Sequence, residues 1–168
     1  MAARARASRT QIGGWLLAGA GALLLLAFAS PYIGLEALDG PLLNLLFHAA
    51  MTAGFGLLAV ENRGALRVAF AASALGWLLR IIALFTSLAG LVALGDLLAV
   101  VGPIVGASLL LAASKTARAG ATALLIAAIL GLAYIFPVLV SFLGPVIEGV
   151  PAVFGAMLLI AGMLLPRR

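Results

Sequence analysis

Long apolar runs, separated by short charged or turn-forming segments, occupy nearly the whole chain. They cover residues 12–29, 41–60, 65–88, 94–113, 119–142 and 146–165. Each is close to the roughly 20 residues that an α-helix needs to cross a bilayer core of about 30 Å. Of the 168 residues 65% are hydrophobic and 9% charged, whereas soluble domains are about 45–50% apolar and about 25% charged. The sequence therefore predicts an all-α polytopic integral membrane protein, a bundle of six transmembrane helices.

The charged residues alternate between the two sides of this predicted bundle. Basic residues precede the first run, follow the last and occupy every second gap: Arg4, Arg6, Arg9, Arg63, Arg67, Lys115, Arg118, Arg167 and Arg168. Four of the five acids lie in or next to the other gaps: Glu36, Asp39, Asp96 and Glu148. The exception is Glu61, which lies beside Arg63 in a gap on the basic side. The positive-inside rule assigns the basic side to the cytoplasm. Both terminal segments, residues 1–11 and 166–168, are thus expected in the cytoplasm, and the chain in the plasma membrane as a multi-pass protein.

The first run has a second interpretation, as a cleaved signal peptide. Arginines precede it, and Ala27-Phe28-Ala29 resembles an A-x-A cleavage site. Its apolar stretch of about 18 residues exceeds the usual 7–15 of a signal sequence. We therefore expect the run to be retained as a helix, and cleavage with five remaining spans is the alternative.

Short connections and small residues predict an up-down bundle. Asp39-Gly40-Pro41 and Gly95-Asp96 have the composition of turns, and short turns make consecutive helices antiparallel neighbours. Small residues recur at spacings that let membrane helices approach closely. They are Gly13, Ala18 and Ala22 in the first run and Gly102 and Gly106 in the fourth. Packing within one chain explains them, and a homodimer face is the alternative.

Arg80 lies inside the third run rather than in a gap. An arginine at the centre of a membrane helix costs about 2.5–3.5 kcal/mol on insertion scales. Counted from Arg67 at 1.5 Å per residue, Arg80 lies about 20 Å along the helix, in the outer half of the bilayer. We expect Asp96, across the next hairpin, to pair with it. The alternative is that Arg80 extends to the outer headgroups.

The second run carries a polar stripe of Asn44, His48 and Thr52, spaced by four and so on one helix face. His48 lies about 10 Å below Pro41 by helix rise, close to the depth of Arg80. These positions predict an outer-half pocket formed by Asn44, His48, Arg80 and Asp96 that binds an anionic or carbonyl-bearing molecule. Polar contacts between helices are the competing explanation. Further candidates for the pocket are Trp77, Tyr134 and Ser141.

Several other chemistries lack the residues they need. A metal site requires three or four ligands, but the chain has one histidine and no cysteine. Gly106-Ala107-Ser108-Leu109 lacks the second glycine of a nucleophile elbow. The basic residues are small groups at span ends, where anionic lipid attracts them. We therefore expect no metal, no cofactor and no nucleic-acid partner.

Two classes of function remain open from the sequence. The first is a non-enzymatic integral membrane protein, either a small-molecule binding or transport module or an accessory subunit of a membrane complex. Its partners would be the lipid bilayer, a small polar or amphipathic ligand, and other membrane subunits or a second copy of the chain. The second is a membrane-embedded lipid-modifying or redox enzyme that uses His48 and Arg80.

Overall fold

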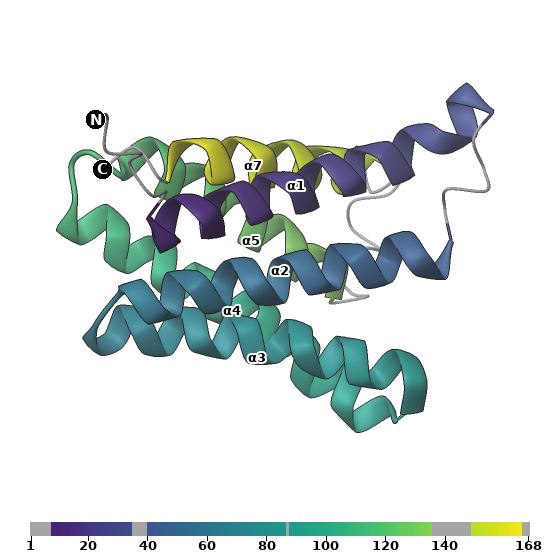
Figure 1. Ribbon diagram of the computed structural model, residues 1–168, viewed down its shortest axis with the longest axis horizontal. Coiled ribbons are helices and arrows are strands. Elements are labelled where there is room, and N and C mark those ends of the chain that lie inside the picture. The colour runs from purple at the N-terminus through teal and green to yellow at the C-terminus, as the bar shows by residue number, and fades with distance from the viewer. Residues whose placement is uncertain (1–7, 35–39, 87, 136–148, 166–168) are drawn as a thin grey trace, which may run out of the picture.

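The computed structural model describes residues 8–34, 40–86, 88–135 and 149–165, and these residues are helical almost throughout. Figure 1 shows a bundle of long helices. They are α1 (Arg9–Ala29), the short 3-10 helix η1 (Ser30–Ile33), α2 (Pro41–Glu61), α3 (Gly64–Thr86), α4 (Ala89–Ala113), α5 (Arg118–Ile135) and α7 (Val150–Leu164). The described residues thus confirm an all-helical chain.

Four of these helices, α1 to α4, are long and apolar enough to cross a membrane, and α5 and α7 are shorter apolar helices within the described residues. Their surfaces are apolar on the outside as well as the inside: Val68, Leu42 and Phe85 are all more than two-thirds exposed. A helix that is hydrophobic all round belongs in a large core or in lipid. These helices therefore indicate a membrane protein.

The six α-helices of the described residues pack as a closed ring. Each of α1 to α4 packs against the next helix in the chain, α5 packs on α7, and α7 packs back on α1. The short α2–α3 and α3–α4 connections leave each pair no alternative to antiparallel packing. The start of α1, the end of α7, and the α2–α3 and α4–α5 connections all lie at one end of the bundle (Figure 1).

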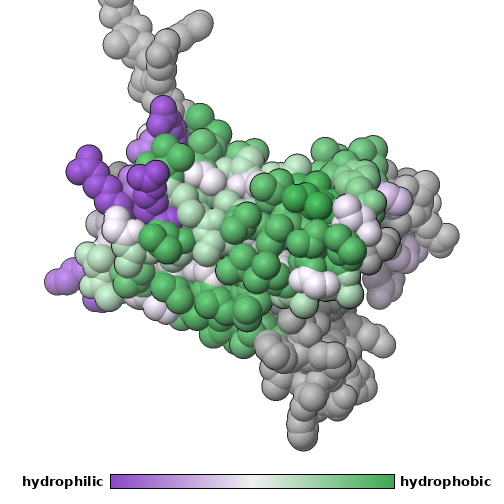
Figure 2. Space-filling model, turned by 90° about the horizontal axis from the view of Figure 1, so that it is seen from below, coloured by the Kyte–Doolittle hydropathy of each residue, from purple (hydrophilic) through white to green (hydrophobic). Residues whose placement is uncertain are grey.

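Hydrophilic residues gather at this same end, and the flank beside them is mostly hydrophobic (Figure 2). Among the described residues Arg9, Arg63 and Lys115 belong to it, because they lie at the start of α1 and in the two connections. We refer to it as the basic end and to the opposite one as the far end. The predicted outer acids Glu36, Asp39 and Glu148 lie outside the described residues.

The predicted start of the fourth run is wrong. The run was expected to begin at residue 94, with turn residues at Gly95-Asp96, but α4 begins at Ala89 and includes both residues. Leu88 caps this helix, and its carbonyl accepts from Leu91 N and Val92 N. Glycine and aspartate are common in turns, but in an apolar surrounding the backbone must form helical hydrogen bonds, and these extend α4 through both residues. Pro103 lies inside α4, and Pro137 lies outside the described residues.

Small residues form the closest contacts between helices. A Cβ at Gly76 of α3 would overlap the backbone of α4 at Ala99 and Gly95, and one at Gly102 would overlap Ser73. Gly162 of α7 meets the backbone of α1 at Ala18 in the same way. The expectation of close packing is confirmed at Ala18 and Gly102. It is wrong at Ala22, which is exposed.

Candidate functional site

A cavity of about 230 Å³ lies inside the ring, and all six α-helices contribute to its wall. One lining residue from each, in chain order, is Leu24, His48, Trp77, Val100, Gly131 and Phe154. The cavity is also lined by Asn44, Arg80 and Asp96. The four residues predicted to form a pocket therefore surround one cavity, in walls that are otherwise mostly apolar.

Arg80, His48 and Asp96 share one depth. Arg80 lies six residues before the end of α3 at Thr86, and His48 and Asp96 lie seven residues after the starts of α2 and α4. By helix rise this is roughly 10 Å from the far end. The depth predicted for Arg80 and His48 from the sequence agrees with this placement.

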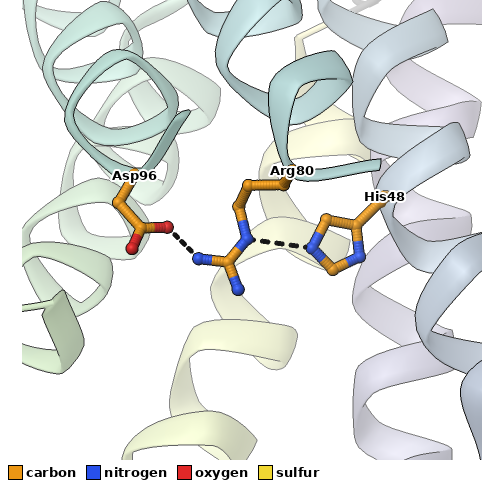
Figure 3. A network of polar contacts seen from close by, with 3 residues as sticks. All are labelled: His48, Arg80 and Asp96. Carbon is orange, nitrogen blue, oxygen red and sulfur yellow. Dashed lines mark hydrogen bonds and ion pairs between the residues drawn. The ribbon is translucent and has the colours of Figure 1, made fainter. Parts of the chain in front are cut away.

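Arg80 connects its two neighbours across three helices (Figure 3). Its Nη1 forms an ion pair with Asp96 Oδ1, and its Nε donates to His48 Nε2 at 3.1 Å. The guanidinium therefore donates to acceptors on two sides, and the predicted pairing with Asp96 is confirmed. The Arg80 side chain is 34% exposed and the Asp96 side chain 16% exposed.

The close contact of α3 with α4 positions this ion pair. Because Gly76 has no side chain, the two backbones meet one turn before Arg80. A Cβ at Gly95 would lie 3.1 Å from Arg80 Cγ, so the arginine stem crosses α4 directly over this glycine. The next residue along α4 is Asp96, which is thereby within reach of the guanidinium.

His48 is 3% exposed, and both of its ring nitrogens are occupied. An arginine Nε–H can only donate, so His48 Nε2 must accept and carries no proton. Nδ1 then bears the proton and donates to the Asn44 carbonyl oxygen at 2.6 Å. The imidazole is thus held as one neutral tautomer, with its orientation fixed by its own helix and by Arg80.

Of the other two residues in the predicted polar stripe, one lines the cavity and one does not. Asn44 is exposed and lines the cavity. Thr52 does not line it, because its hydroxyl donates back to the His48 carbonyl oxygen at 2.8 Å. The side chains of Tyr134 and Ser141 lie outside what the structure describes.

An aromatic cluster that the sequence only partly indicated forms one wall. The rings of Phe47, His48 and Trp77 meet edge to face with centroid distances of 5.3–5.4 Å. Trp77 was a candidate, but Phe47 is one apolar residue in an apolar helix and carries no distinguishing pattern. Trp77 Nε1 is buried without a hydrogen-bond partner among the described residues.

No protein-family model, no curated protein and no solved structure matches this chain. The class of protein is therefore described from the fold, the apolar surface and the polar cluster alone. In the described residues it is an all-helical protein with four helices long and apolar enough to cross a membrane, and with a charged, hydrogen-bonded cluster on the wall of a central cavity.

Proposed function

We propose that the protein is a non-enzymatic integral membrane protein of the plasma membrane that binds a small polar or amphipathic molecule in its central cavity. It would act as a binding or transport module. The observation that carries this proposal is the convergence of all six helices on one cavity whose wall holds Arg80, His48 and Asp96. Ionisable residues within membrane spans are costly, and they commonly mark the path of a substrate or ion.

The proposed topology has six spans with both termini in the cytoplasm. The basic end would then be cytoplasmic and the far end external, because positive residues favour the inner side. The cavity would lie in the outer half of the bilayer, and its ligand would enter from the outer leaflet. This assignment rests on the grouping of the described basic residues at one end of the bundle.

The groups in the cavity suit a ligand with an anionic or carbonyl oxygen. Arginine can present parallel N–H donors to such oxygens, a geometry that lysine lacks. An enzymatic role is less well supported, because the lone pair of His48 Nε2 already accepts from Arg80 and is not available as a base.

The test is mass spectrometry of the molecules that copurify with the protein in mild detergent. A bound small molecule should be retained by wild type and lost in Arg80→Gln and His48→Ala. Arg67→Gln is the matched control, because Arg67 is exposed and lies at the basic end of the same helix.

Retention of the same molecule by all variants would show that the cluster is architectural. Copurification of partner chains without a small molecule would favour an accessory subunit. A catalytic activity that His48→Ala removes without disturbing assembly would favour the enzyme.

A further inference from the structure

The central cavity borders a cleft between α1 and α2. The two helices are closest near the basic end, where a Cβ at Gly13 would lie 3.0 Å from Gly54 O. They diverge toward the far end (Figure 1), and there a cleft of about 790 Å³ separates them. Leu24, Asn44 and Phe47 line both the cavity and the cleft. The two spaces therefore share a wall at these residues.

The cleft is apolar and elongated along α2. Its wall runs from Pro41 to Phe47 on α2, with Leu23 and Ala27 on α1 and Leu84 and Phe85 on α3. Asn44 is the one polar side chain among its described lining residues. Because this cleft lies between helices whose outer surfaces are apolar, it is suited to a hydrocarbon chain.

The size of the cavity limits what it can hold. A cavity of about 150 Å³ accommodates benzene, and drug-sized ligands occupy about 300–1,000 Å³. At about 230 Å³ the central cavity fits a small head group and not a whole lipid. The remainder of a larger molecule would have to lie in the cleft.

Of the two kinds of ligand oxygen that Arg80 suits, anionic and carbonyl, the charges in the cavity favour an uncharged, carbonyl- or hydroxyl-bearing head group. Arg80 is paired with Asp96, and His48 is held as a neutral tautomer, so these three side chains together carry no net charge. A carboxylate that approached Arg80 would also approach the Asp96 carboxylate, which repels it. Asn44, at the junction of the two spaces, offers one amide donor and one acceptor to a neutral hydroxyl or ester.

We propose that the ligand is an uncharged single-chain lipid, with a hydroxyl- or carbonyl-bearing head group in the central cavity and its chain in the cleft between α1 and α2. This inference rests on the proposed function and specifies the ligand of the same cavity. The chain gains little on leaving the bilayer, because hydrocarbon is as apolar as the cleft. Selectivity therefore comes from the head group.

Trp77 can report the occupant directly. It packs against Phe47 at the junction with a centroid distance of 5.3 Å and is 9% exposed. The second tryptophan, Trp15, is 64% exposed. The chain has two tryptophans, so Trp15→Phe leaves Trp77 as the single one. Bromine atoms quench tryptophan fluorescence on close approach, and a lipid brominated in its chain reports whether that chain enters the cleft.

The experiment titrates the Trp15→Phe protein in detergent with 1-(9,10-dibromostearoyl)glycerol or with ionised 9,10-dibromostearate, which carry the same chain. The neutral lipid should quench Trp77 saturably and bind about tenfold or more tightly than the carboxylate. Ala27→Phe, which fills the cleft, should weaken this binding about tenfold. Ala22→Phe, an exposed position on the same helix outside the cleft, should leave it unchanged. Asn44→Leu should weaken binding of the neutral lipid about two- to tenfold, the effect of one hydrogen bond.

Four results would overturn the inference. Tighter binding of the carboxylate, lost in Arg80→Gln, would mean that the cavity holds an anion, and the proposed function would stand. Saturable quenching that Ala27→Phe leaves unchanged would place the chain elsewhere. If neither lipid quenches Trp77 saturably but a small molecule still copurifies in an Arg80-dependent way, the cleft is rejected as a chain-binding site and the cavity remains the proposed ligand site. If there is neither saturable quenching nor a copurifying molecule, the lipid inference and the proposed function are both rejected.

Discussion

Arg80 is held by two side chains from different helices, and these two partners contribute to its stability in different ways. Asp96 balances its charge, whereas His48 fixes the orientation of the guanidinium through Nε. Removing one member of a buried ion pair is more damaging than removing both, because the remaining charge loses its compensation. His48 contributes differently, because an uncharged acceptor is sufficient for its hydrogen bond.

Asp96→Asn should therefore lower the free energy of unfolding by about 3 kcal/mol, the lower end for a broken buried pair because Arg80 is partly exposed. Thermal unfolding in detergent measures this, with Glu61→Gln as the control at the exposed basic end of α2. The double variant Arg80→Leu with Asp96→Leu should recover much of the loss. Equal unfolding temperatures for Asp96→Asn and Glu61→Gln would show that the pair contributes nothing to stability.

Two substitutions of His48 distinguish the contribution of its hydrogen-bond acceptor from that of its ring. In His48→Gln the amide oxygen can still accept from Arg80 Nε, whereas in His48→Leu that donor loses this acceptor. A polar group left unsatisfied in the interior costs about 1–3 kcal/mol. We expect His48→Gln to be more stable than His48→Leu by about that amount in the same unfolding assay. A leucine variant as stable as the glutamine variant would contradict the role assigned to Nε2.

Helices α3 and α4 show how backbone contact places the polar groups. Gly76 and Gly95 allow the two helices to meet, and Arg80 lies one turn beyond the contact. Replacing Gly76 with leucine should push the helices apart and separate Arg80 from Asp96. Overpacking of this kind costs about 1–3 kcal/mol or more.

Gly90 provides the matched control for this prediction. It lies on α4, and a Cβ there would meet nothing within 4 Å. Gly90→Leu should be neutral or slightly stabilising, because leucine is a better helix former than glycine, whereas Gly76→Leu should unfold at a lower temperature. The same effect for both variants would mean that the α3–α4 contact does not depend on close backbone approach.

The helical runs and the Arg80–Asp96 pair could be predicted from the sequence because each depends on local pattern or on depth along one helix. The start of α4 could not, since Gly95 and Asp96 also satisfy the composition of a turn. Phe47, Gly131 and Phe154 were missed as cavity residues because apolar side chains in apolar helices carry no distinguishing pattern. The cleft between α1 and α2 follows from the angle at which two helices diverge, which residue type alone does not determine.

Across the whole molecule, the side of the membrane on which each connection lies decides where the cavity faces. The closed ring joins helices of unequal length, and α5 and α7 are the shorter ones within the described residues. If both span the bilayer, Gly149 at the start of α7 lies on the opposite side from Lys115 in the α4–α5 connection. If they do not span, these two residues share a side and the outer-half assignment of the cavity loses its basis.

Thiol accessibility in intact cells tests the proposed topology most directly, and the chain has no cysteine of its own. Single cysteines at Tyr32, Leu88 and Gly149, which lie at the far end, should react with a membrane-impermeant reagent added outside. Cysteines at Arg63 and Lys115, at the basic end, should react only after permeabilisation. Labelling of Lys115→Cys from outside, or protection of Gly149→Cys until permeabilisation, would contradict the six-span topology and the outer-half cavity that depends on it.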